Sequence, residues 1–127
     1  MCLTTGNEVT YANIKTASIQ KELAVFNNMA WDTLNFAQCE SNIGILTKYK
    51  KLEEIIVCKK IQIRGNSLTV VGDCYGMIRA YNYPSVSQQC KSCLFSGHSY
   101  PINDIECFDD GIMSIDEKGC IIKWVVQ

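Results

Sequence analysis

The stretch DCYGMIRAY, residues 73–81, recurs 43 residues later as DEKGCIIKW, residues 116–124. Each copy has an aspartate three residues before a glycine and a large aromatic five residues after that glycine. The glycine and the aromatic are Gly76 and Tyr81 in the first copy, and Gly119 and Trp124 in the second. An acid followed by glycine favours a tight turn, and the run that ends in the aromatic is typical of a β-strand. The recurrence therefore predicts a repeated unit that contains this turn and this strand.

Short strand-like runs fill most of the chain on both sides of these copies, and helical spacing of apolar residues is not sustained anywhere. Two runs near the start predict a hairpin: Glu8 to Asn13 and Ile19 to Val25. Four more predict one complete unit: Glu54 to Lys60, Ser67 to Gly72, Met77 to Asn82 and Lys91 to Ser96. The last three repeat its first three strands: Ile102 to Phe108, Ile112 to Ile115 and Cys120 to Val126. From Trp31 to about Lys51 the sequence predicts an insertion or long loop.

The length of the unit predicts the architecture. Gly6 and Tyr11 repeat the glycine-to-aromatic spacing without the acid. A period in the forties with four short strands is typical of a propeller blade, so we expect an all-β fold, a partial β-propeller of about two to two and a half four-stranded antiparallel blades. Residues 1–30 would be the end of one blade with two strands, 31–96 a complete atypical blade with an insertion, and 97–127 most of a blade without its last strand. Because propellers close with about four to eight blades, we expect a segment of a longer protein, or one that other copies or partners complete.

A second motif resembles the WD-repeat family. Gly97-His98 precedes a predicted strand, Ser114 and Asp116 lie in the next one, and Trp124 ends the third. In that family a buried network of histidine, serine or threonine, aspartate and tryptophan ties the strands together. The resemblance implies that His98 hydrogen-bonds toward Asp116, that Ser114 bridges, and that Trp124 donates its indole N–H. The last unit would then be a WD-type blade.

The middle of the chain resembles the echinoderm microtubule-associated protein-like (EMAP-like) family. That family's propellers carry the series Gly72-Asp73, Gly76, Tyr83-Pro84 and Gly97-His98-Ser99. Trp31 followed by Gly44-Ile45 is similar to its long atypical blade. The residues taken as blade signatures are Gly76, Tyr81, Gly97, Gly119, Trp31 and Gly44.

This resemblance implies a non-catalytic interaction scaffold in a cytoplasmic, cytoskeletal protein, with tubulin or other cytoskeletal proteins as partners. The alternative is a WD-repeat adaptor of another complex that does not bind tubulin. Half of the twelve lysines and arginines fall within residues 48–64 and form a candidate patch for the acidic tails of tubulin. They are Lys48, Lys50, Lys51, Lys59, Lys60 and Arg64. Alternation along a strand would send these side chains to both faces, so an ordinary solvated surface is the other interpretation.

Composition argues against other function classes. The 127 residues carry a net charge of −1, which does not favour nucleic-acid binding, and contain no apolar run long enough for a membrane helix. The only histidine, His98, is already assigned to the network, and no phosphate-binding glycine loop is present. We therefore expect no enzyme activity and no cofactor.

Eight cysteines stand without paired spacing, and several lie within apolar runs. They predict reduced thiols that act as small buried hydrophobes. Cys90-Lys91-Ser92-Cys93, with His98 nearby, leaves open a zinc site or a redox dithiol. A structural zinc site needs about four ligands, usually two such pairs, and a second CxxC is absent. An ordinary loop and strand is the favoured interpretation.

Overall fold

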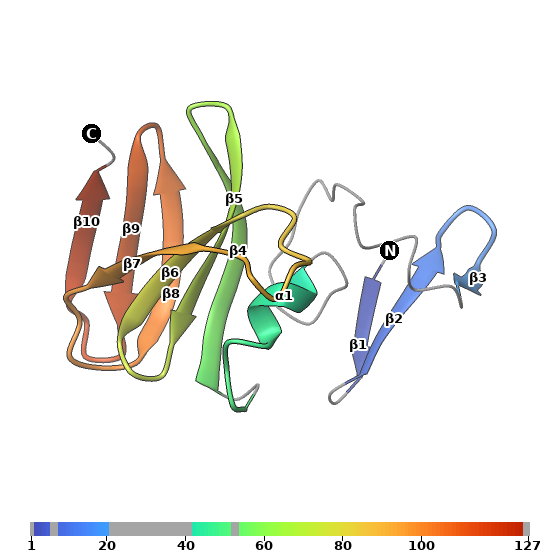
Figure 1. Ribbon diagram of the computed structural model, residues 1–127, viewed down its shortest axis with the longest axis horizontal. Helices are drawn as coiled ribbons and strands as arrows, with labels where there is room; N and C mark the ends of the chain where they lie inside the picture. The colour runs from blue at the N-terminus through green and yellow to red at the C-terminus, as the bar shows by residue number, and fades with distance from the viewer. Residues whose placement is uncertain (1, 6–7, 21–41, 52–53, 126–127) are drawn as a thin grey trace.

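The computed structural model describes residues 2–5, 8–20, 42–51 and 54–125 (Figure 1). Within these residues the fold is all-β, as predicted, and its strands form three antiparallel sheets, none of which closes on itself. Neighbouring strands in each sheet are consecutive in the chain. This meander arrangement is compatible with part of a β-propeller.

Two of the sheets are the predicted four-stranded and three-stranded units. The first contains β4 (Ile55–Ile63), β5 (Asn66–Asp73), β6 (Met77–Asn82) and β7 (Ser92–Ser96). The second contains β8 (Ile102–Phe108), β9 (Gly111–Asp116) and β10 (Ile121–Val125). Strand β4 continues three residues beyond the predicted end at Lys60. It continues because the hairpin turn is confined to Arg64 and Gly65, both with positive φ, 51° and 79°.

The first two strands of these sheets pair in the same way. Ile55 lies opposite Asp73 in one sheet, and Ile102 lies opposite Asp116 in the other. The register then shifts directly after each pair, so that both first strands carry an irregularity at the same place. A bulge bends the strand and increases its twist. The two sheets are therefore built on one plan that the 43-residue recurrence marks in the sequence.

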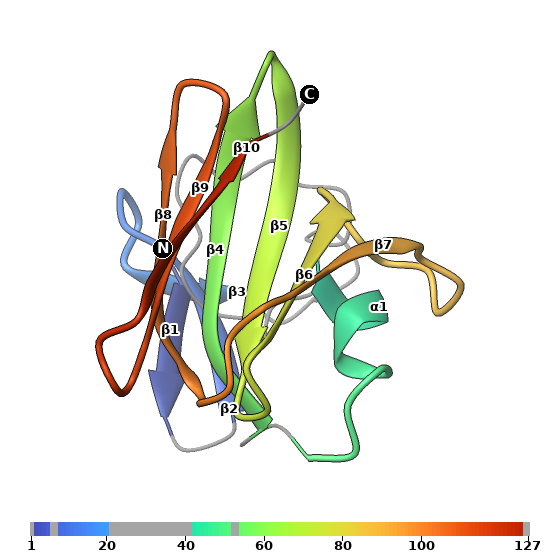
Figure 2. The same cartoon turned by 90° about the vertical axis from the view of Figure 1, so that its left-hand side faces the viewer.

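The main core lies between these two sheets. It is made by buried isoleucines and a valine from both: Ile61, Ile63, Val70, Ile78, Ile102, Ile105 and Ile112. Half-buried Phe95 and Trp124 close it, with their ring centroids 5.5 Å apart in an edge-to-face arrangement. In Figure 2, β8 and β9 lie to the left of β4 and β10 crosses in front of β4, while β5 and β6 continue the four-stranded sheet to the right. The packing places His98, which follows β7, beside the second sheet.

The opposite face of the four-stranded sheet is covered by residues 42–51. They contain α1 (Ile43–Leu46), a single helical turn that the sequence did not predict. Ile45 is fully buried against Cys58, Val71 and Tyr81, and Leu46 and Tyr49 pack on the same cluster. The part of the expected loop that the structure describes is thus a packed layer, and β5 is buried on both faces.

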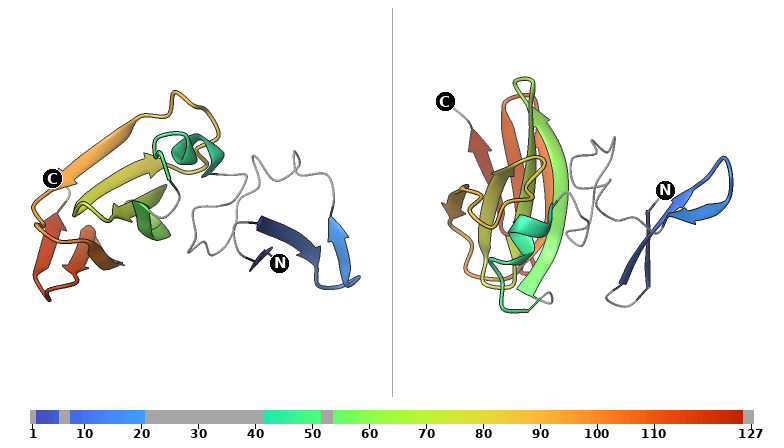
Figure 3. Two further views of the ribbon diagram at one scale, coloured as in Figure 1. Left: turned by 90° about the horizontal axis from the view of Figure 1, so that it is seen from below. Right: turned by 45° about the vertical axis from the view of Figure 1, so that its right-hand side comes forward.

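The third sheet is N-terminal and lies apart from the other two in the views of Figures 1 and 3. It contains β1 (Cys2–Thr5), β2 (Glu8–Asn13) and β3 (Ser18–Gln20). The antiparallel pairing of β2 with β3 agrees with the predicted hairpin as far as Gln20, and residues 21–25 of the predicted second strand lie outside the described residues. The sequence predicted two strands in this region, and β1 is a third, paired with β2. It was missed because its four residues, CLTT, are too few to show a periodic pattern.

Candidate functional site

The two D-x-x-G motifs form the same turn. One oxygen of Asp73 accepts hydrogen bonds from the backbone N–H groups of Tyr75 and Met77, both at 2.9 Å. The matching oxygen of Asp116 accepts from Lys118 and Cys120, both at 3.0 Å. The motif's glycines, Gly76 and Gly119, have φ values of 80° and 86°, which strongly favour glycine. Each aspartate therefore holds its turn through backbone groups, which explains the spacing of acid and glycine.

The second oxygen of Asp116 faces a chain of three side chains. It lies 3.0 Å from His98 Nδ1, and His98 Nε2 lies 2.7 Å from Ser114 Oγ. The Trp124 indole N–H donates to the same Ser114 oxygen at 2.8 Å. One arrangement of protons satisfies all three contacts: Ser114 accepts from Trp124 and donates to His98 Nε2, and His98 Nδ1–H donates to Asp116. Each group of the chain has a partner, so burying it carries no large desolvation cost.

The structure thus brings together the four residues that the WD-repeat resemblance named. Ser114 and Asp116 lie on β9, Trp124 lies on β10, and His98 comes from the loop between β7 and β8. The side chain of His98 is 0% exposed and that of Asp116 is 2% exposed. Burial raises the pKa of Asp116, but the hydrogen bonds from His98, Cys120 and Lys118 outweigh burial and hold the pKa below its usual value.

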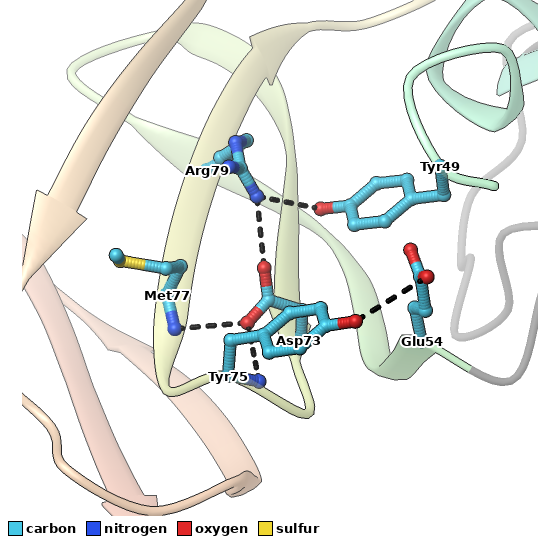
Figure 4. A network of polar contacts seen from close by, with 6 residues as sticks. All are labelled: Tyr49, Glu54, Asp73, Tyr75, Met77 and Arg79. Carbon is cyan, nitrogen blue, oxygen red and sulfur yellow. Dashed lines mark hydrogen bonds and ion pairs between the residues drawn. The ribbon is translucent and has the colours of Figure 1, made fainter. Parts of the chain in front are cut away.

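The second oxygen of Asp73 has a different partner (Figure 4). It lies 2.8 Å from Nη1 of Arg79, which also donates to the Tyr49 hydroxyl at 3.2 Å. Burial raises the pKa of Tyr49 to about 12, although the Arg79 hydrogen bond opposes the shift. The sequence pattern did not predict this network. A signal was available, because Asp73 repeats Asp116 while Val71 and Tyr81 stand where Ser114 and Trp124 stand in the other unit.

Two exposed tyrosines lie at this end of the sheets. Tyr75 is 64% exposed and Tyr100 is 45% exposed. The turn at Gly76 packs on residues 97–101, the loop between β7 and β8. A Cβ at Gly76 would lie 2.9 Å from the carbonyl oxygen of Tyr100. The Tyr75 hydroxyl lies 3.4 Å from the Glu54 carboxylate, whose charge raises the pKa of Tyr75. Lys118 lies over the ring of Tyr100.

The remaining signature residues serve packing. A Cβ at Gly97 would lie 3.0 Å from the Trp124 ring, and Tyr81 is 2% exposed beneath residues 42–51. Gly44 donates its N–H to the carbonyl oxygen of Ser85 at 2.8 Å, and any side chain there would overlap the backbone at Ser87. Trp31 lies outside the described residues.

The lysine patch is not brought together on one surface. Lys59 points toward β8, where its Nζ lies 2.9 Å from Asp104 and also contacts Glu106. Burial lowers the pKa of Lys59, but these hydrogen bonds outweigh it and raise the pKa above its usual value. Lys60 lies over the Tyr83 ring, and Arg64 lies in the β4–β5 turn.

The part of the patch before β4 is more accessible. Lys48, Lys50 and Lys51 are exposed in the segment that follows α1. Lys48 donates to the carbonyl oxygen of Gln88 at 2.6 Å. The candidate cluster is divided because its members belong to three local structures: Lys48, Lys50 and Lys51 precede β4, Lys59 and Lys60 occupy alternating positions on β4, and Arg64 lies in the β4–β5 turn.

One described group has the composition of a metal site. Ligand atoms of His98, Asp116 and Cys120 lie within 4.8 Å of one another. Both ring nitrogens of His98 are already hydrogen-bonded, so a metal ion would have to displace the proton shared with Asp116. Half-buried Cys90 packs against the cluster around Tyr81, and Cys93 is exposed on β7. Among the described cysteines none is joined in a disulfide.

The polar side chains of the site are hydrogen-bonded to one another and to backbone groups of the two turns. No helix formed by the described residues has the length and apolar character that crossing a bilayer requires. The chain matches no family model, no curated protein and no solved structure.

Proposed function

We propose that the chain is a segment of a WD-repeat β-propeller of the EMAP-like kind and that it acts as a non-catalytic protein-interaction scaffold. The observation that carries the proposal is the common plan of two successive sheets, with the same D-x-x-G turn and the same irregularity after Ile55 and after Ile102. The second sheet adds the chain of hydrogen bonds from Trp124 to Asp116. Further blades of a parent protein, or other copies, would complete the ring.

A scaffold role is supported by how the polar groups are used. Asp73 and Asp116 each hold two backbone N–H groups, and both nitrogens of His98 are engaged within the protein. A general base must reach the group that it deprotonates, and these side chains are committed to structure. Exposed surface, rather than buried chemistry, is then what the fold presents to partners.

Tubulin is the partner that the EMAP-like resemblance favours, in a cytoplasmic, cytoskeletal setting. Lys50 and Lys51 are exposed and lie directly before β4, whereas Lys59 is held by Asp104 and Glu106. We therefore assign contact with acidic tails to the lysines after α1. Attraction of this kind weakens as salt screens the charges.

Co-sedimentation with polymerised tubulin tests the proposal. The chain should pellet with microtubules at low ionic strength, and Lys50→Glu with Lys51→Glu should abolish pelleting. A matched double change, Lys15→Glu with Lys91→Glu, alters the net charge equally at two other exposed positions and should have little effect. Equal loss in both double variants would show that net charge, not the surface after α1, governs the result.

The second candidate is an adaptor that binds another protein. It is favoured by Tyr75 and Tyr100, which are exposed at one end of the sheets and lie on loops that contact each other. Tyrosine is enriched where proteins meet because its ring is apolar and its hydroxyl can hydrogen-bond. Failure of the chain to pellet at low salt would favour this candidate over tubulin binding.

A further inference from the structure

The three-stranded sheet has one face that no described element covers. Residues paired across β8, β9 and β10 share that face in three rows. The rows are Asp104–Ile115–Ile121, Glu106–Met113–Lys123 and Phe108–Gly111–Val125. We call this surface the outer face. It includes a shallow depression of about 170 Å³ lined by Met113, Ile115 and Ile121.

The equivalent face of the four-stranded sheet indicates what kind of surface packs on the outer face. Val70 and Ile78 occupy the positions of Met113 and Ile121 in the four-stranded sheet, 43 residues earlier. They are 1% and 0% exposed because the three-stranded sheet packs on them. Met113 is 44% exposed and Ile121 is 64% exposed. The outer face therefore repeats a surface that another β-sheet covers in the same molecule.

The charges on the outer face favour packing against the outer face of a second copy of this chain. Glu106 and Lys123 lie at opposite ends of one row, with Met113 between them. A two-fold axis parallel to β9 places each Glu106 opposite the partner copy's lysine and brings the two central methionines together. An axis across the strands would instead oppose like charges, which is unfavourable. Glu106 also contacts Lys59, and a carboxylate has oxygens enough for two cations.

We infer that the outer face is an interface between two copies of this chain, packed face to face about a two-fold axis parallel to β9. Two sheets pack with their strands nearly aligned at a separation of about 10 Å. Ile115 then meets its own counterpart, and Phe108 meets Val125 of the other copy. The surface is self-complementary, as an isologous interface requires. The proposed interface does not depend on tubulin binding. A further blade of a propeller would pack on this same face, so the dimer and a ring closed through this face exclude each other.

Sedimentation equilibrium of the complete 127-residue chain tests this interface. The chain should dimerise in a concentration-dependent way. Lys123→Glu and Glu106→Lys should each weaken the dimer by roughly tenfold or more, because each places like charges opposite one another twice. The double variant restores opposite charges with their positions exchanged, so it should recover most of the affinity.

Two further variants separate the interface from folding. Ile121→Gln removes apolar area at a position already 64% exposed, so the chain should keep its circular dichroism spectrum while the dimer weakens. Leu94→Glu changes a residue 55% exposed on β7, outside the outer face, and should leave the dimer intact. A chain that is monomeric at every concentration overturns the proposal. A double charge variant that fails to recover overturns the two-fold register.

Microtubule pelleting and dimerisation give independent results. A dimer that does not pellet supports the interface and contradicts tubulin binding. A monomer that pellets does the opposite. A monomer whose outer face is covered when a longer chain is expressed, seen as protection of Met113 from oxidation, would assign the face to another sheet of a parent protein and would overturn the proposed dimer.

Discussion

The turns after β5 and β9 begin with equivalent aspartates and differ in what the second carboxylate oxygen meets. At Asp116 it meets His98, which is held in turn by Ser114 and Trp124. At Asp73 it meets Arg79, which reaches solvent and also contacts Tyr49. The first oxygen has the same role in both turns, because it accepts hydrogen bonds from two backbone N–H groups.

The difference follows from what covers each aspartate. Asp116 lies where two sheets pack together, and its second oxygen is hydrogen-bonded there to a chain of buried and half-buried side chains, His98, Ser114 and Trp124. Asp73 lies under residues 42–51, where the positions of Ser114 and Trp124 are taken by Val71 and Tyr81 in an apolar cluster. With no histidine at this position, the second oxygen of Asp73 pairs with Arg79, whose side chain is 30% exposed. The D-x-x-G turn therefore forms in the same way in both sheets. The partner of the second carboxylate oxygen, in contrast, is set by the layer that packs over each aspartate: the other sheet at Asp116 and residues 42–51 at Asp73.

The largest effect is expected from removing the two carboxylates. Asp73→Ala should lower the free energy of unfolding by about 2–4 kcal/mol, because two backbone N–H groups lose their acceptor while Arg79 can turn to solvent. Asp116→Ala should destabilise the chain further, since it also strands the fully buried His98. Urea unfolding at neutral pH measures both changes. If Asp73→Ala lowered the free energy of unfolding more than Asp116→Ala, the ion pair with Arg79, and not the hydrogen bonds of the turn, would be the main contribution of Asp73 to stability.

An exchange of the residues that distinguish the two units should have an intermediate effect. Ser114→Val leaves His98 Nε2 and the Trp124 indole without their shared partner, and Val71→Ser places a hydroxyl among Ile45, Cys58 and Tyr81. Each should cost about 1–3 kcal/mol.

The two costs should add in the double variant, because the sites lie on opposite sides of the four-stranded sheet and share no contact. Thermal unfolding of the two single variants and the double variant measures this. A neutral Ser114→Val would show that the hydrogen-bonded chain contributes no stability, and the proposed role of His98 would fail with it.

Local patterns were sufficient to predict the strands and turns. The bounds of β2, β6 and β8 follow from alternation and from the turn residues that flank them. The four residues of the Asp116 network were also found, because a resemblance supplied a grouping that spacing alone does not. Acid and glycine at a fixed distance predicted a turn whose backbone hydrogen bonds depend on no distant residue.

Features created by contacts between distant segments were not predictable. Helix α1 is one turn long and has no side-chain cap, and Gly44 is held by Ser85 across the fold. Tyr49 and Arg79 are 30 residues apart and meet only when residues 42–51 cover the sheet. The six basic residues were not predictable as one surface for a related reason, since they are divided among the segment after α1, strand β4 and the β4–β5 turn.

The smallest effect is expected at the edge of the Asp73 network. Tyr49→Phe should cost about 1 kcal/mol or less at neutral pH, because it removes one hydrogen bond whose donor, Arg79, keeps Asp73. The effect of Tyr49→Phe on the free energy of unfolding should become measurable at alkaline pH. The folded pKa of Tyr49 is about 12, above the unfolded value of about 10, so folding is favoured fully below pH 10 and less as the pH rises toward 12.

Stability measured by urea unfolding between pH 9 and pH 12 should therefore fall less steeply for Tyr49→Phe than for the unchanged chain. Tyr75→Phe is the matched control, since that ring is 64% exposed and its hydroxyl contacts the partly exposed Glu54. Parallel curves for Tyr49→Phe and the unchanged chain would mean that Tyr49 titrates like an exposed tyrosine. Residues 42–51 would then not seal the Asp73 side of the sheet in solution, and the contrast between the two aspartates would rest on Arg79 alone.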